Sequence, residues 1–128
     1  MSTYIGIDYG TKRIGIALSD DSGTLAFPLE VIPAGKESTG RIKDIADEHT
    51  ASAIVMGESR MRSGEENPIL KDSRACADEL EKTTGLKVYF EWEYDTSQEA
   101  RKMQGKTEVN DASAAALILQ RYLDKQNG

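Results

Sequence analysis

Three short segments patterned like β-strands open the chain, and their order narrows the folds that it can adopt. Residues Thr3–Tyr9 are nearly all apolar, which is typical of a central strand covered on both faces. Segments 14–18 and 25–31 alternate apolar residues with small or polar ones at the period of two expected for strands. Turn-forming residues separate the three segments, and Pro28 inside the third predicts an edge strand. The opening third is therefore predicted to be a three-stranded antiparallel meander.

Helical and strand-like patterns then alternate along the rest of the chain. The expected order is helix 38–49, strand 53–57, helix 67–84, strand 88–93, a short helix opening at 96–99, and a last helix with its apolar stripe over 109–123. The polar residues 125–128 are expected to fray. A meander followed by two helix-linked strands predicts an α/β fold with one mixed five-stranded sheet and helices on its faces.

Length and charge restrict the classes of function. The 128 residues, of which 38% are hydrophobic, suit a single globular domain spanning 1–128. The 22 acidic residues outnumber the 16 basic ones, which gives a net charge of −6. This charge repels phosphate backbones, so coating nucleic acid without regard to sequence is an improbable role. A nucleic-acid enzyme of this composition needs local basic patches and a cation at its acidic site.

Other features exclude membrane, secretory and zinc-finger classes. No apolar run approaches the roughly 18 residues that a membrane span requires. The first ten residues resemble neither a signal peptide nor a transit peptide, so a cytoplasmic protein is expected. The single cysteine, Cys76, excludes an internal disulfide and a CxxC zinc site, and its helical spacing predicts a buried, inert thiol.

Three carboxylates lie at strand ends or at a helix start, the positions where α/β sheets commonly place functional groups. Asp8 ends the central strand, Glu93 closes the fifth strand, and Asp111 lies in the first turn of the last helix. Each has an ordinary structural explanation, namely a turn cap, a solvated strand end and compensation of the helix dipole. Together they could converge at one edge of the sheet, where clustered carboxylates would bind Mg²⁺ or Mn²⁺. Two-metal phosphodiester hydrolysis uses such a set.

The two ends of the sequence carry motifs of a known family. Residues 6–17, GIDYGTKRIGIA, followed by Ser19-Asp20, resemble the first motif of the YqgF-type nucleases, also called Holliday junction resolvases or pre-16S rRNA nucleases. Residues 111–123, DASAAALILQRYL, resemble their last motif, and 54–57 and 85–88 match the family's fourth strand and the entry to its fifth. The resemblance covers nearly the whole chain and implies an RNase H-like fold.

The resemblance also implies a site and a reaction. It assigns Asp8, Glu93 and Asp111 as the catalytic carboxylates that bind Mg²⁺ or Mn²⁺. It implies hydrolysis of structured nucleic acid, with maturation of the 5′ end of a ribosomal RNA precursor favoured over cleavage of branched DNA. Resolving a Holliday junction by two symmetric nicks would require a homodimer. The chain departs from the family pattern beside Glu93, where Trp92 and Tyr94 replace an Asp and an Arg.

Basic residues near these carboxylates are the expected substrate contacts. Lys12 and Arg13 follow the first strand, Arg60 and Arg62 follow the fourth, and Lys106 precedes the last helix. Their ordinary alternative is a solvated surface of mixed charge. Two other functions stay open: a non-catalytic nucleic-acid-binding module on the same fold, and a phosphate loop like that of actin- and hexokinase-like ATPases. The ATPase alternative is weak because 128 residues supply only one of the two lobes.

Overall fold

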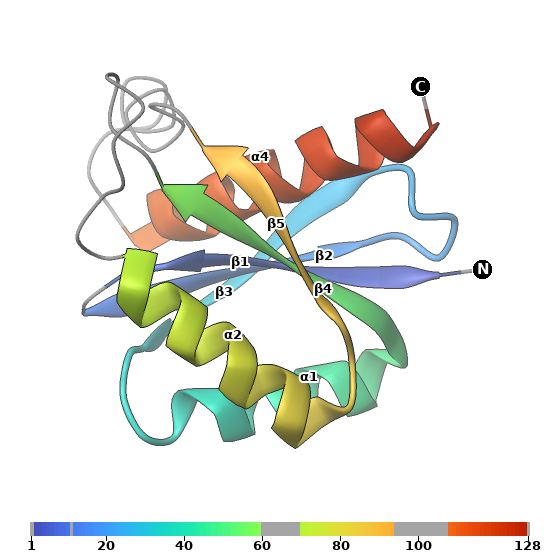
Figure 1. Cartoon of the computed structure of the whole chain (residues 1–128). Helices are drawn as coiled ribbons and strands as arrows, with labels where there is room; N and C mark the ends of the chain where they lie inside the picture. Colours follow the sequence, from blue (N-terminus) through green and yellow to red (C-terminus); the bar gives the residue numbers. More distant parts are fainter. Residues whose placement is uncertain (1, 11, 60–69, 94–107, 128) are drawn as a thin grey trace.

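The computed structural model describes residues 2–10, 12–59, 70–93 and 108–127. These residues form one five-stranded sheet with strand order β3-β2-β1-β4-β5 and three helices (Figure 1). The strands are β1 (Thr3–Tyr9), β2 (Arg13–Ser19), β3 (Ala26–Pro33), β4 (Ala51–Ser59) and β5 (Val88–Glu93). The helices are α1 (Ser38–His49), α2 (Leu70–Thr84) and α4 (Glu108–Asn127). The α/β fold with a mixed five-stranded sheet is confirmed.

The strand pairing confirms both halves of the predicted topology. β1 pairs antiparallel with β2, and β2 pairs antiparallel with β3. β1 pairs parallel with β4, and β4 pairs parallel with β5. β3 lies at the edge, as Pro28 predicts, and its register with β2 shifts between Ile16 and Ala17. The carboxyl ends of β1, β4 and β5 therefore lie at the same end of the sheet.

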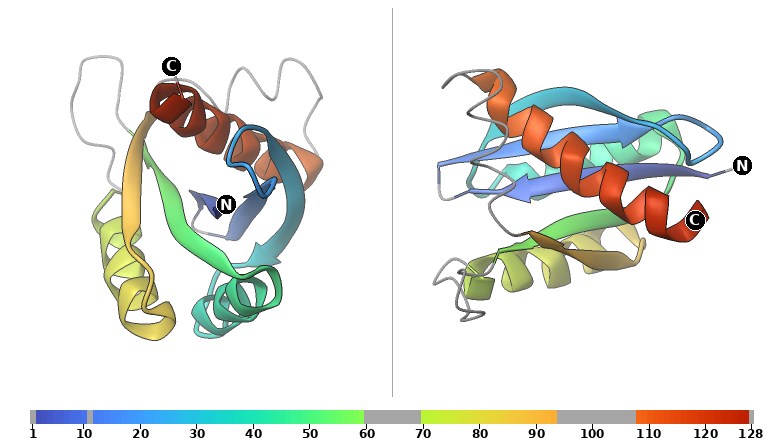
Figure 2. Two further views of the ribbon diagram at one scale, coloured as in Figure 1. Left: turned by 90° about the vertical axis from the view of Figure 1, so that its right-hand side faces the viewer. Right: turned by 90° about the horizontal axis from the view of Figure 1, so that it is seen from above.

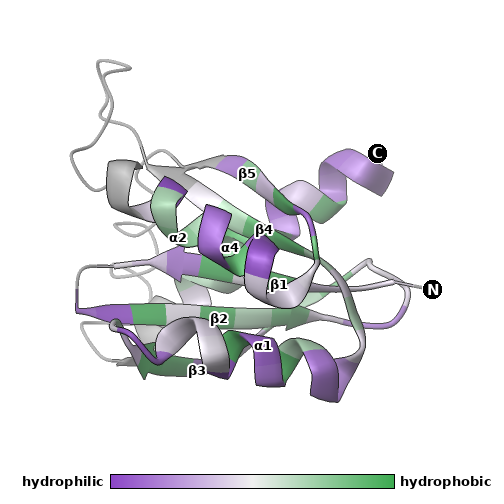
Figure 3. Cartoon of the chain, turned by 60° about the horizontal axis from the view of Figure 1, so that its bottom comes forward, coloured by the Kyte–Doolittle hydropathy of each residue, from purple (hydrophilic) through white to green (hydrophobic). Residues whose placement is uncertain are grey.

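Helices cover both faces of the sheet, so each face buries its own core. Figure 2 shows α1 and α2 on one side of the strands and α4 on the other. The α1/α2 side buries a cluster that includes Ile5, Ile7 and Ile54. The α4 side buries a smaller one that includes Ala17, Val55 and Leu119. Adjacent residues of one strand enter opposite cores because side chains alternate along a strand. Figure 3 shows hydrophobic residues along the strands, whereas hydrophilic and hydrophobic residues alternate along α1.

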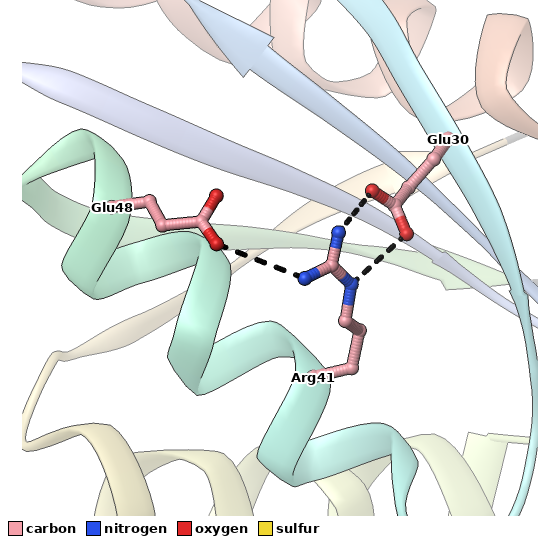
Figure 4. Close-up of polar contacts among 3 residues, drawn as sticks. All are labelled: Glu30, Arg41 and Glu48. Carbon is pink, nitrogen blue, oxygen red and sulfur yellow. Dashed lines mark hydrogen bonds and ion pairs between the residues drawn. The ribbon is translucent and has the colours of Figure 1, made fainter.

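Helix α1 has the bounds that the sequence predicts and is tied to the edge strand by an ion pair. The Arg41 guanidinium donates to both carboxylate oxygens of Glu30 in β3, at 2.7 and 3.1 Å (Figure 4). A longer contact of 3.9 Å joins Arg41 to Glu48. Helix α2 ends at Thr84, and Gly85 follows with a φ of 75°, a left-handed conformation that glycine adopts without strain. The expected start of α2 at 67–68 lies outside the described residues.

The C-terminal prediction of fraying from residue 125 is wrong, because α4 continues to Asn127. The Asn127 amide donates to the carbonyl oxygen of Gly23 at 3.0 Å, and Lys125 forms an ion pair with Glu91. The Asn127 contact spans 104 residues of sequence and the Lys125 contact spans 34, so local polarity did not reveal them. β4 is also longer than the predicted 53–57. The short helix expected at 96–99 falls outside the described residues. None of the described helices is both long and apolar enough to cross a membrane.

Candidate functional site

Asp8 lies near the end of β1, on the face of the sheet that α4 covers. It is half-buried and stands opposite Gly15 of β2. Side chains alternate along the strand, so Asp8 shares its face with Tyr4 and Gly6. Tyr4 contacts Tyr122 of α4, with ring centroids 6.0 Å apart. The structure therefore puts the Asp8 carboxylate on the α4 side of the central strand.

Glycine at position 6 allows α4 to cross β1 at very short range. A methyl group added to Gly6 would lie 2.8 Å from the Cβ of Leu119 and 2.9 Å from the carbonyl oxygen of Ala115. The order of contacts from Tyr122 over Tyr4 to Ala115 over Gly6 shows that α4 runs antiparallel to β1. Position 111, one turn before Ala115, is therefore at the Asp8 end of the helix.

Glu93 ends β5 at the same end of the sheet. Its register partner is Ser59, the last residue of β4, and both strands run parallel to β1. The arrowheads of β1, β4 and β5 and the start of α4 lie on the same side of the molecule in two views (Figures 1 and 2). The structure thus brings the backbone positions of all three predicted carboxylates to one end. The side chains of Glu93 and Asp111 lie outside the described part.

Two of the five predicted basic residues can be located. Lys12 is exposed in the connection from β1 to β2, and Arg13 is exposed as the first residue of β2, at the same end as Asp8. The Lys12 carbonyl oxygen accepts a 2.9 Å hydrogen bond from the Ala34 backbone, which joins this turn to the segment after β3. The other three, Arg60, Arg62 and Lys106, fall outside the described residues.

A groove on the opposite face of the sheet, along α2, includes basic residues that the sequence did not reveal. It has a volume of about 770 Å³ and is lined by Tyr9, Lys36 and Lys82 among others. Asp78 and Glu79 also line it, so its charge is mixed. Lys36 follows β3, at the same end as Asp8, whereas Lys82 is in the last turn of α2, which leads to the start of β5 at the other end.

Cys76 lines the same groove, and its thiol has low reactivity. The thiol is half-buried against the core on the α1/α2 side, where the sequence predicted a buried residue. Burial, with a smaller contribution from the charge of Glu79, raises the pKa of the Cys76 thiol to about 11. A thiol of this pKa is almost entirely protonated near neutral pH, so it is a poor nucleophile and metal ligand.

The described side chains by themselves make no metal site. Among the described residues, no three His, Cys, Asp or Glu side chains gather as metal ligands would. The side chains of Glu93 and Asp111 are not among those described, so that set does not include the predicted triad. The sequence also did not indicate the ion pair between the buried Glu91 and the exposed Lys125, which connects β5 with the last turns of α4.

Comparisons with known proteins give the family. The model of the RuvX family, described as a Holliday junction resolvase, matches residues 2–125. A Bordetella parapertussis protein named "Putative pre-16S rRNA nuclease" is 36% identical over 124 residues, covering 95% of this chain and 93% of that protein. A Nitratidesulfovibrio vulgaris protein of the same name is 32% identical over 125 residues, covering 96% and 84%.

Solved structures agree on the fold. RuvC of T. thermophilus in complex with a Holliday junction substrate superimposes with a TM-score of 0.64 at 16% identity, covering 98% of this chain and 96% of that one. The Fowlpox virus resolvase with Holliday junction DNA gives 0.58 at 10% identity, covering 98% and 99%. These superpositions show a shared fold. The sequence matches along nearly the whole length show homology. The chain therefore belongs to the RuvX family of nucleases.

Proposed function

We propose that the chain hydrolyses phosphodiester bonds in structured nucleic acid with Mg²⁺ or Mn²⁺, which Asp8, Glu93 and Asp111 hold. The observation that carries the proposal is the meeting of β1 and α4. Asp8 lies on the face that α4 covers, two residues after the glycine over which the helix crosses. Asp111 belongs to the first turn of that helix, and Glu93 ends a strand parallel to β1.

The donor atoms suit a hard divalent cation. Carboxylate oxygens are the ligands that Mg²⁺ and Mn²⁺ prefer. Several carboxylates at one end of a sheet also need a cation if all are to stay ionised, and the net charge of −6 strengthens that need. In phosphodiester hydrolysis, divalent ions activate a water molecule and stabilise the charge that develops on the leaving oxygen.

Basic residues at the same end are proposed to hold the substrate. Lys12 and Arg13 are exposed beside the end of β1, where they can bind backbone phosphates that the acidic chain would otherwise repel. Arg60, Arg62 and Lys106 are proposed for the same role from their places in the sequence. Binding through these cations should weaken steeply as salt concentration rises.

Two substrates are supported, each by a different comparison. The names of the curated relatives favour the 5′ end of a ribosomal RNA precursor. The family description favours a Holliday junction, whose symmetric cleavage would require a homodimer with two sites. We favour the RNA precursor because relatives at more than 30% identity carry that name along nearly their whole length.

A substrate panel tests the reaction and the site together. Labelled precursor rRNA leader, single-stranded RNA and a four-way DNA junction are incubated in Mg²⁺, Mn²⁺ or EDTA. Asp8→Asn is compared with wild type and with Asp44→Asn, a control at an exposed position of α1. Loss of a metal-binding carboxylate removes several kcal/mol of transition-state stabilisation, so Asp8→Asn should be slower by more than about a hundredfold. Asp44→Asn should cut at the wild-type rate.

The pattern of cleavage also separates the alternatives. Metal-dependent cutting that Asp8→Asn loses supports the nuclease site, and the substrate that is cut names the class. If the wild type binds these substrates and cuts none of them in either metal, the non-catalytic binding module replaces the proposal.

A further inference from the structure

Glu91 is a buried carboxylate on β5 with a partner on α4. Its side chain is 5% exposed, and one carboxylate oxygen lies 2.6 Å from the Nζ of Lys125, whose own side chain is 65% exposed. A carboxylate so deeply buried is costly unless it is compensated by a charge or by hydrogen bonds. The exposed Lys125 supplies that charge from the surface.

A second contact runs beside the ion pair. The ring of Tyr89 packs against that of Tyr122, with centroids 5.5 Å apart. Tyr89 and Glu91 are two apart on one face of the strand, and Tyr122 and Lys125 are three apart on one face of the helix. β5 is the last strand of the sheet. These two contacts therefore tie an edge strand, across its face, to the last turns of α4.

Both elements joined by this tie also carry a proposed metal ligand. Glu93 is two residues beyond Glu91, the next position on the same face of the strand. Asp111 is in the same helix as Lys125, fourteen residues earlier, or about 21 Å along its axis. Between them, α4 crosses β1 at Gly6. A tilt of the helix about that crossing moves its two ends in opposite directions, so a shift near Lys125 also displaces Asp111.

We infer that Glu91 and Lys125 form a positioning pair, which fixes the separation between Glu93 and Asp111 and so tunes the affinity of the site for its metal ion. The inference rests on the proposed function. Neither residue touches substrate in this role, and both act through the carboxylates. An exposed ion pair would have little influence, but loss of Lys125 leaves a buried charge that must move towards water. That movement would draw β5 away from α4.

The test compares Lys125→Met with a matched control on α1. Lys125→Met keeps the apolar stem and removes the charge. Lys43→Met makes the same change in an exposed pair, in which Lys43 lies 2.8 Å from Asp47. Two quantities are measured: the Mn²⁺ concentration that half-saturates cleavage, and the rise in melting temperature that Mn²⁺ produces without substrate. Disturbing groups that orient metal ligands typically weakens binding ten- to a hundredfold.

We expect Lys125→Met to raise the half-saturating Mn²⁺ concentration about tenfold and to shrink the Mn²⁺-induced rise in melting temperature, with the KM for nucleic acid unchanged. Lys125→Arg should recover most of the affinity, and Lys43→Met should match the wild type. Glu91→Gln, which buries no charge, provides a second variant if Lys125→Met does not fold, and it should show a smaller loss of affinity in the same direction.

Two results would overturn the inference. The first leaves the proposed function standing, and the second contradicts the proposed function as well. If the wild type cuts and gains stability from Mn²⁺, and Lys125→Met melts earlier but binds Mn²⁺ equally well, the pair is merely structural. If the wild type neither cuts nor gains stability from Mn²⁺, the proposed function fails and the positioning role fails with it.

Discussion

Replacing Gly6 with alanine should destabilise the protein, although alanine is usually the more favourable residue on entropic grounds. The added methyl carbon would lie 2.8 Å from the Cβ of Leu119 and 2.9 Å from the backbone oxygen of Ala115. Ordinary contact begins near 3.4 Å, so the helix would have to withdraw by about 0.6 Å at this crossing (3.4 minus 2.8). Leu119 and Ala115 are fully buried, so neither can turn aside into solvent.

The magnitude follows from two opposing effects. Forcing an extra methyl group into a well-packed core typically costs about 1–3 kcal/mol. Restricting the unfolded chain by replacing glycine returns about 0.4–1 kcal/mol. The net loss should be about 1–2 kcal/mol, which lowers the melting temperature of a domain of this size by about 4 °C for each kcal/mol. The rate of cleavage should also fall, even where the protein stays folded, because the same displacement moves the start of α4 relative to Asp8.

Urea denaturation followed by circular dichroism measures the change, with Gly40→Ala as the control. Gly40 lies within α1, and nothing is within 4 Å of a methyl group added there. The same substitution should stabilise the protein at that position by about 0.5–1 kcal/mol, because alanine is the better helix former. The close crossing would be refuted if Gly6→Ala were as stable as the wild type or more stable.

Two further predictions concern ionisable groups away from the proposed site. Burial raises the pKa of Cys76 to about 11, so iodoacetamide at pH 8 should modify this thiol about a hundredfold more slowly than free cysteine, and the thiol's contribution to stability should be lost as pH rises through that value. A rate equal to that of free cysteine would contradict this. Hydrogen bonds from the Thr24 and Leu25 backbones and the Ser22 hydroxyl lower the pKa of Asp20. Its stabilising effect should be present above about pH 4 and lost as pH falls through the lowered pKa. Urea midpoints between pH 5 and pH 2 should therefore fall less steeply in Asp20→Asn than in the wild type.

The elements that the sequence predicted well are those whose pattern is local. The apolar run of β1, the alternation in β2 and the apolar stripe of α1 reflect which faces of each segment meet a core, and the structure has these elements within one residue of the expected positions. The ends of β4 and α4 were mistaken because distant partners determine them. β4 extends along its neighbours in the sheet, and the last turn of α4 is held by the carbonyl of Gly23.

The candidate site divides in the same way. The ends of β1 and β5 and the start of α4 could be located from the sequence, because strand ends and helix starts have local signatures. That Lys36 and Lys82 line one groove could not be predicted, since it requires α2 to pack beside the segment that follows β3. The ion pair between Glu91 and Lys125 could not be predicted either, because it forms only when α4 packs on β5. In the sequence, a lysine near a helix terminus has the pattern of an ordinary solvated residue.

The crossing at Gly6 explains why the first and last motifs of the chain belong together. Gly6 and Asp8 are successive positions on one face of β1, and α4 crosses that face at Gly6. The glycine lets the helix approach to backbone contact, and the aspartate then lies towards the turn where that helix begins. Helix starts carry a partial positive charge, which favours a neighbouring carboxylate and partly offsets the repulsion among several of them. A larger residue at position 6 would separate the helix from the strand and so weaken the role of Asp8 without altering its chemistry. The spacing Gly-x-Asp at the start of the chain therefore depends on the last helix: the glycine allows α4 to approach β1, and the aspartate lies towards the start of that helix.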